Sequence, residues 1–131
     1  MRTLTDHKLN GLNDALTITV FDEPGQGNAC HEYEISLSSS PVAGGPDVAQ
    51  GARYTTPIKF QNGPIQESGV NGISGEALLA IVIDRLRGFQ SGKFACRENA
   101  IALTKIEEGL MWLQKRTRDR EARGVEGRNI V

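Results

Sequence analysis

The chain has 131 residues, of which 38% are hydrophobic, 24% charged and 5% aromatic, and its net charge is −1. This length excludes two independent domains, so we expect residues 1–131 to form a single domain with a modest hydrophobic core. No run approaches the about 18 apolar residues of a membrane span, and residues 1–10 lack the apolar stretch of a secretory signal, which predicts a cytoplasmic protein.

The first part of the chain, residues 1–73, has the pattern of β-structure. Residues 15–21 and 30–37 alternate between apolar and polar side chains, as expected of strands with one buried face. Turn-forming residues at 22–28 separate them and predict a hairpin. Residues 38–52 have neither a helical nor a strand period, so we expect a mobile loop there.

A third strand is expected at residues 57–61, before Asn62-Gly63, a pair that favours a tight turn. We expect the chain to resume an extended path through Pro64 and on to Ile73. The three strands together predict a small antiparallel sheet.

The second part, residues 74–131, changes to a helical period. Ser74 is a suitable N-cap, and a helix of about 14 residues should run from there to Gly88 or Phe89. A second helix of about 29 residues is expected from Ala95 to Arg123, with Gly124 in the position where helices commonly stop. The expected fold class is therefore α+β, with a small N-terminal antiparallel sheet followed by an antiparallel helical hairpin.

The two expected helices differ in length, so the shorter one covers only about half of the longer one. The uncovered half contains the apolar residues Leu110, Met111, Trp112 and Leu113. An apolar surface of this size is rarely left wet on a small monomer, and dimerisation through the long helices, with two-fold symmetry, would cover it.

One stripe along the long helix changes in character from end to end. Taken at intervals of three and four, which we expect to keep the residues on one face, it contains Cys96, Asn99, Leu103, Ile106, Leu110, Leu113, Arg116, Arg120 and Arg123. The net charge also changes along the chain: residues 1–84 carry a net charge of −6 and residues 85–131 carry +5. A polar pocket could therefore lie at either end of the apolar seam.

Each of these residues has a structural reading and a functional one. Arginines in the last turns of a helix interact favourably with its dipole and can pair with Asp119 or Glu121, whereas arginines gathered on one face suit bidentate contacts to phosphate. Phe89 and Phe94 flank the inter-helix loop and either plug the end of the core or offer a ring on which a base stacks. The Asn99 amide could read a base edge or a ribose hydroxyl.

An antiparallel dimer would bring the arginine end of one long helix to the Phe89 and Asn99 end of its partner. Two pockets per dimer would result, suited to a small molecule with a base and a diphosphate. No catalytic motif is present, so we expect a binding protein and no enzyme. Cys30 and Cys96 stand 66 positions apart with no second ligand at metal spacing, which predicts reduced, buried thiols and no metal or cofactor.

Four segments of the chain, residues 58–65, 76–86, 94–99 and 112–127, closely resemble phage anti-Thoeris sponge proteins. The resemblance implies a non-enzymatic phage protein, acting in the cytoplasm of the infected bacterium, that sequesters a cyclic ADP-ribose isomer such as a glycocyclic ADP-ribose made by TIR enzymes. The family's pocket residues match Phe89, Asn99, Arg116 and Arg120, and the stripe adds Arg123.

The same resemblance implies a homodimer, with hexamers as trimers of dimers, and separate sites for cyclic di- or trinucleotides of the CBASS pathway. Family members commonly continue after Gly127 with Thr-His, whereas this chain has Arg128-Asn129.

Two other classes of protein remain open on sequence grounds. A basic helix at the end of a dimer suits a nucleic-acid-binding regulator, although the net charge of −1 and the acidic first 84 residues argue against a polymeric nucleic acid. A pure assembly protein would form a stable oligomer without any small-molecule ligand.

Overall fold

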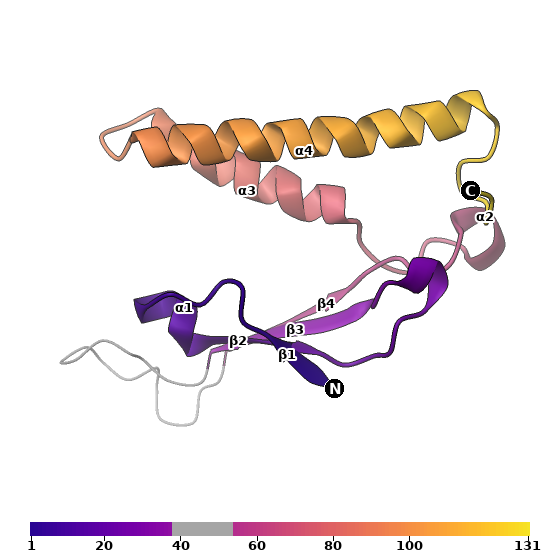
Figure 1. Ribbon diagram of the computed structural model, residues 1–131, viewed down its shortest axis with the longest axis horizontal. Coiled ribbons are helices and arrows are strands. Elements are labelled where there is room, and N and C mark those ends of the chain that lie inside the picture. Colours follow the sequence, from indigo (N-terminus) through magenta and orange to yellow (C-terminus); the bar gives the residue numbers. More distant parts are fainter. Residues whose placement is uncertain (38–53) are drawn as a thin grey trace. The chain divides into compact units, whose positions relative to one another are not determined.

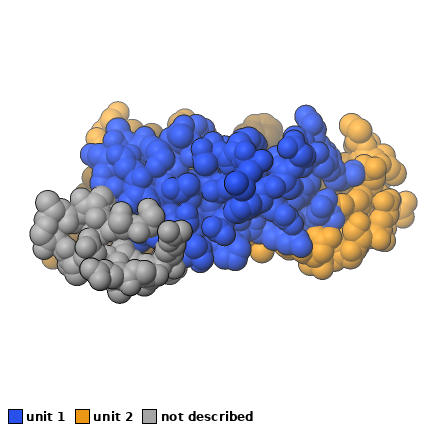
Figure 2. All heavy atoms as spheres, turned by 90° about the horizontal axis from the view of Figure 1, so that it is seen from below, with its two compact units in different colours: residues 1–62 blue, residues 63–131 orange. Residues whose placement is uncertain are grey.

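The computed structural model describes residues 1–37 and 54–131, so the loop expected at 38–52 lies outside the described residues. Contacts divide the chain into two compact units, residues 1–62 and 63–131, which Figure 2 colours separately. Each unit is described by itself below, and the expectation of a single domain stays a prediction. In chain order the elements are β1 (Arg2–Leu4), α1 (Gly11–Ala15), β2 (Leu16–Val20), the 3-10 turn η1 (Gln26–Asn28), β3 (Glu32–Leu37), β4 (Tyr54–Lys59), α2 (Ile65–Ser68), α3 (Gly75–Gln90) and α4 (Arg97–Ala122), as labelled in Figure 1.

The first unit contains a four-stranded antiparallel sheet in the order β1-β2-β3-β4. Ile18 pairs with Ile35 and Val20 with Tyr33, so apolar side chains share one face, and Val20 is fully buried. The small antiparallel sheet expected from the sequence is confirmed. β4 begins and ends a little earlier than expected, and β1 was not predicted because three residues are too few to show a strand period.

The turn between β2 and β3 is organised by one carboxylate. Asp22 Oδ2 accepts a hydrogen bond from the main-chain N–H of His31 at 2.8 Å, and Oδ1 accepts one from that of Glu32 at 3.1 Å. Partial burial of this carboxylate opposes ionisation, but the N–H donors of Glu32 and His31 and the nearby His31 ring outweigh it and lower the pKa of Asp22. This turn confirms the predicted hairpin.

The second unit begins with a helical turn at a place where the sequence predicts an extended path, so that prediction is wrong. The extended path expected from Pro64 to Ile73 is interrupted by α2, a single helical turn in which the N–H groups of Glu67 and Ser68 donate to the carbonyl of Pro64. Pro64 has a φ of −64°, which already fits the start of a helix. Four residues are too few to show a helical period, so the alternation of residue types gave no sign of this turn.

The helical hairpin of α3 and α4 is confirmed, with its boundaries shifted by a few residues. Ser74 is the N-cap of α3, and its hydroxyl accepts from the N–H of Ala77 at 3.1 Å. Cys96 is the N-cap of α4 and is exposed, so the expectation that both thiols are buried is wrong for Cys96 and right for Cys30. The loop between the helices is tied by Gln90 Oε1, which accepts from the N–H of Cys96.

The end of α4 has the hydrogen bonds of a Schellman motif. Gly124, with a φ of 72°, donates its N–H to the carbonyl of Glu121, and Val125 donates to that of Arg120 at 3.0 Å. The helix therefore stops where Gly124 predicts that it should. It is 26 residues long, against 16 for α3, and in Figure 1 it extends well past α3.

The packed seam of the hairpin is short. Ile83 of α3 is buried, with 4% of its surface exposed, and Leu103, Ile106 and Leu110 of α4 are half-buried. Beyond the seam, Trp112 is 67% exposed, as expected for the part of α4 that α3 does not cover. No helix within residues 1–37 and 54–131 is long and apolar enough to cross a membrane.

Candidate functional site

The stripe expected on one face of α4 winds around the helix. Cys96 and Arg123 are 27 residues apart, which is about seven and a half turns at 3.6 residues per turn, so they lie on opposite sides. The face that continues from Leu110 passes through Leu113 to Thr117, whose hydroxyl donates to the carbonyl of Leu113 at 3.3 Å. The arginines therefore leave the seam that packs against α3. Arg116 follows Trp112 by one turn of the helix, on an exposed side.

The first end of α4 presents an aromatic ring and an amide. Phe89, near the end of α3, is 39% exposed, and the guanidinium carbon of Arg85 lies 5.5 Å from the centre of its ring. Asn99, in the first turn of α4, is half-buried, and its side-chain amide makes no hydrogen bond with any other described residue. This end therefore offers a stacking surface beside an amide that is both donor and acceptor.

Arg85 was missed by the sequence analysis, although a signal for it exists. It precedes Phe89 by four residues, and side chains four apart on a helix are neighbours. Phe94, on the other side of the loop, is 68% exposed, with Lys93 Nζ 5.7 Å from its ring centre, so it does not plug the core.

The second end of α4 presents two exposed arginines. Arg116 is exposed and makes no hydrogen bond or ion pair within residues 1–37 and 54–131, and Arg123 is exposed with one bond from Nη2 to the main-chain oxygen of Val131 at 2.6 Å. Asp119, a partner that the structural reading gave to the arginines, is instead paired with Lys115 at 2.6 Å. Arg116 is therefore free to bind an anion.

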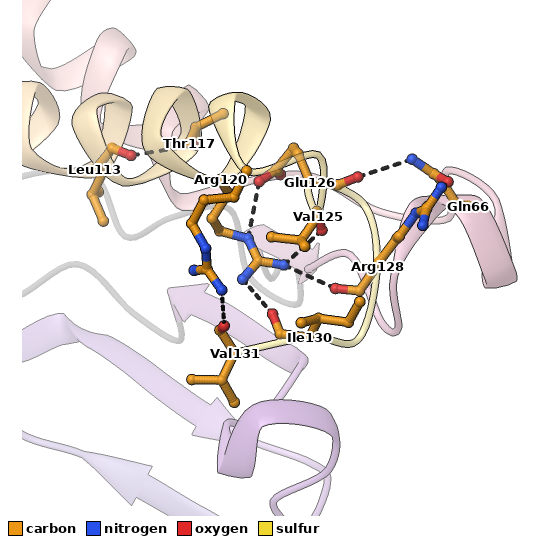
Figure 3. Close-up of polar contacts among 10 residues, drawn as sticks. Gln66, Leu113, Thr117, Arg120, Val125, Glu126, Arg128, Ile130 and Val131 are labelled. Carbon is orange, nitrogen blue, oxygen red and sulfur yellow. Dashed lines mark hydrogen bonds and ion pairs between the residues drawn. The ribbon is translucent and has the colours of Figure 1, made fainter.

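Arg120 differs from both of its neighbours. Its side chain is only 11% exposed, and Figure 3 shows its guanidinium enclosed by the chain that follows the helix. Nε donates to a carboxylate oxygen of Glu126 at 3.1 Å, Nη1 to the oxygen of Ile130, and Nη2 to those of Val125 and Arg128. An arginine has five N–H donors, so one remains for any ligand.

A single chain does not bring its two candidate ends together. Asn99 and Arg116 are 17 residues apart on one helix, which corresponds to about 26 Å along the axis. A small nucleotide cannot span this distance. Each chain therefore holds two separate halves of the expected site, one with Phe89 and Asn99 and one with the arginines.

Among the described residues, no group of three or more His, Cys, Asp or Glu side chains is placed to hold a metal ion. The chemistry of both halves is that of binding: a ring, an amide and guanidinium groups.

A family model matches the helical part of the chain. Residues 56–118 match the model described as Acb2/Tad1, hairpin domain. This range takes in α2, α3 and most of α4, including Phe89, Asn99 and Arg116, and ends before Arg120. The helical part of the chain is therefore similar to the Acb2/Tad1 hairpin domain.

A comparison with individual proteins is more specific. Over 70 residues the chain is 60% identical to "Thoeris anti-defense 1" of Bacillus phage SBSphiJ7, which is 53% of this chain and 49% of that protein. The matched stretch thus spans about half the length of this relative. The resemblance to phage anti-Thoeris proteins is confirmed.

Proposed function

We propose that this chain is a phage anti-defence protein that captures a cyclic ADP-ribose-type nucleotide made by TIR enzymes and holds it without cleaving it. The observation that carries the proposal is the chemical difference between the two ends of α4, within a chain 60% identical over 70 residues to a Thoeris anti-defence protein. One end suits a base and a ribose, and the other suits a diphosphate. In this proposal the protein acts in the cytoplasm of the infected bacterium, where the signal is made.

The proposal requires a second copy of the chain, because the two ends are about 26 Å apart in one copy. An antiparallel pair of α4 helices centred between Glu107 and Glu108 would set Asn99 of one copy level with Arg116 of the other. Ile101 and Trp112, which are 42% and 67% exposed, are symmetric about nearly the same centre. They lie on the other side of the helix from Asn99, which Ile101 follows by two residues, so this register aligns the pocket residues along the axis but does not itself bury the pair on the pocket face.

Each residue then has a distinct role in the proposed pocket. The base stacks on Phe89, the amide of Asn99 binds a base edge or a ribose hydroxyl, and the guanidinium groups of Arg116 and Arg123 bind the diphosphate. Arg120 can add its one remaining N–H. A cyclic ADP-ribose isomer such as a glycocyclic ADP-ribose carries all of these groups.

Sequestration depends on amount as well as affinity. A protein that binds a signal without turnover removes at most one molecule per site, so free signal falls only when sites outnumber signal and the Kd is well below the effector's threshold. We therefore expect tight binding with slow release.

The test is capture from a lysate of cells with an activated Thoeris TIR enzyme. Purified protein is incubated with the lysate, washed, denatured, and the released nucleotide identified by mass spectrometry. We expect an intact cyclic ADP-ribose isomer from the unaltered chain and from Arg118→Ala, and none from Arg116→Ala. Arg118 is the matched control because it is exposed and has no partner among the described residues.

Other outcomes would assign a different function. Recovery of a cleaved product would indicate an enzyme, and retention of no nucleotide would exclude a sponge. Parallel incubations with cyclic di- and trinucleotides test for the separate CBASS sites. Salt-dependent binding of long DNA or RNA would instead favour the nucleic-acid regulator.

A further inference from the structure

One side chain, Gln90, closes the loop that joins α3 to α4. It is the last residue of α3 and is half-buried, and its Oε1 accepts a hydrogen bond from the main-chain N–H of Cys96 at 3.1 Å. Phe89 directly precedes Gln90, and Asn99 lies three residues after Cys96. The bond therefore joins the two segments that carry the ring and the amide of the proposed pocket.

Cys96 holds the start of α4 as its N-cap. Its backbone is extended, with a φ of −151° and a ψ of 163°, and its Sγ accepts from the main-chain N–H of Asn99 at 3.4 Å. Asn99 is the third residue of the helix, one of the positions whose N–H an N-cap side chain commonly binds. Sulfur is a weaker acceptor than a hydroxyl or carboxylate oxygen, so this cap alone fixes the first turn only loosely.

The hydrogen bond of Gln90 replaces one half of a capping box. In that motif the N-cap side chain binds the N–H of the third helical residue, and the side chain of that third residue reaches back to the N–H of the N-cap. Here the first half is present, but the second half comes from Gln90 of the other helix. Asn99 therefore has no task at the cap, and its amide makes no hydrogen bond with any other described residue.

Two further hydrogen bonds in this loop are local. The hydroxyl of Ser91 donates to the carbonyl of Gly88 at 2.7 Å, and the N–H of Ala95 donates to that of Gly92 at 3.2 Å. Both join residues three apart and neither reaches from α3 to the start of α4. The bond of Gln90 differs from them because it spans the loop.

We propose that Gln90 and Cys96 are positioning residues for the base half of the pocket. Gln90 fixes the spacing between the ring of Phe89 and the amide of Asn99. Cys96 holds the backbone of Asn99, so that its amide keeps a donor and an acceptor for a base edge or a ribose hydroxyl. Less conformational freedom is then lost when the ligand binds. The positioning role rests on the proposed function for its ligand and on the described contacts for the cap.

The cap is tested first without ligand, by hydrogen exchange of main-chain amides measured by NMR on the full chain. The N–H of Cys96 reports its bond to Gln90, and the N–H of Asn99 reports its bond to Cys96. We expect faster exchange at both in Gln90→Ala. Gln90→Glu, whose carboxylate can accept the same N–H, should restore slow exchange. Ser91→Ala is the matched control in the same loop and should change neither amide.

Binding of glycocyclic ADP-ribose is then measured by isothermal titration calorimetry. Gln90→Ala should raise the Kd roughly two- to tenfold, the cost of ordering one or two side chains, and Ser91→Ala should leave it unchanged. Cys96→Ala should also raise the Kd, whereas Cys96→Ser, which supplies a better N-cap, should not. Equal weakening by both Cys96 variants would mean that the thiol acts in some way other than as a cap, and would overturn its positioning role.

A double-mutant cycle separates positioning from direct contact with the ligand. If Gln90 acts through the amide of Asn99, its effect disappears with that amide, so adding Gln90→Ala to Asn99→Ala should change the Kd by less than about twofold. The same effect in both backgrounds would make Gln90 a direct contact and overturn the proposal. If Asn99→Ala leaves no measurable binding, the exchange of the Cys96 amide and the two Cys96 variants decide.

Failure of the positioning role can be told from failure of the proposed function. Unchanged exchange at the Cys96 amide in Gln90→Ala would show that Gln90 does not close the loop, and would leave the proposed function standing. If the unaltered chain binds no glycocyclic ADP-ribose, the proposed function fails and the positioning role fails with it.

Discussion

The polar side chains at the two ends of α4 differ in how many hydrogen bonds they already make within the chain. At the first end, the amide of Asn99 has no partner among the described residues, and the ring of Phe89 is partly open. At the second end, Arg120 is nearly saturated by the chain's own oxygens, while Arg116 is left free. Residue type alone therefore does not separate a ligand contact from a structural one. The two cases are separated by the number of hydrogen-bond donors that already have a partner in the chain.

The largest expected effect is on the stability of the helical hairpin, which carries both ends of α4. Ile83 is the buried hydrophobic side chain of the hairpin among the described residues, and Ile83→Ala should lower the free energy of unfolding by about 2–5 kcal/mol. Urea denaturation followed by circular dichroism measures it. Ile81→Ala is the control, because Ile81 is 59% exposed and its loss should change stability little. Equal effects of the two variants would contradict the packing described for α3.

Ligand binding at the first end of α4 can be weakened separately by removing the ring of Phe89. Phe89→Ala should weaken binding of glycocyclic ADP-ribose by about 1–3 kcal/mol, the usual contribution of one stacked base, with little effect on oligomeric state. Isothermal titration calorimetry and size-exclusion chromatography give the two readouts. Phe94→Ala should bind as the unaltered chain does. A Phe89→Ala protein that no longer folds would place this ring in the core instead.

The second end can be tested without changing an arginine, at the contact between residues 124–131 and α2. Gly127→Ala forces a side chain into a left-handed conformation and against Ile65, and should cost about 1–2 kcal/mol. Thermal unfolding and hydrogen exchange of the Gln66 peptide measure it. Gly109→Ala is the opposite case, because Gly109 lies inside α4 with no atom near its Cβ position, and it should stabilise the helix by up to about 1 kcal/mol.

The smallest expected effect is a pH dependence of the stability of the first unit, which contains the sheet. The helical hairpin should not share this dependence. Because the pKa of Asp22 is lowered on folding, its ionised form adds stability above its ordinary pKa of 3.8, and this stability is lost as the pH falls through the lowered value. Hydrogen exchange of the peptide with His31 and Glu32 should rise on going from pH 5 to pH 3, after correction for intrinsic rates. Asp22→Asn should flatten this dependence, whereas the peptides of α3 and α4 should behave alike in both proteins.

The elements long enough to repeat their apolar pattern several times were predictable from the sequence. α3 and α4 repeat their apolar residues over several turns and carry recognisable stops at Ser74 and Gly124, so their type and bounds follow closely. β2 and β3 alternate over five and six residues and were also found. The short elements β1, α1 and α2 have too few residues to show a period, and the contacts of Gln66 in α2 with residues about 60 positions away leave no local signal in the sequence.

The site was predictable only in part, for a geometric reason. Steps of three and four keep to one face only when they alternate to average about 3.6, and the steps from Leu110 to Leu113 and from Leu113 to Arg116 are both three. The arginines thus turn away from the seam at this point. The partners of Arg120 could not be foreseen either, because three of its four acceptors are main-chain oxygens, which leave no signature in the sequence.

The use of main-chain oxygens by Arg120 affects which residue types can vary at the end of the chain. A guanidinium that binds backbone oxygens places no demand on the side chains of the residues that supply them, since every residue type has the same carbonyl. Only Gly127, for its conformation, and Glu126, for its carboxylate, are constrained by residue type at the Arg120 and Ile65 contacts. Substitutions at Arg128 and Asn129 should therefore leave the main-chain contacts of Arg120 in place, although replacing Arg128 would remove the bond from its Nε to Gln66 Oε1.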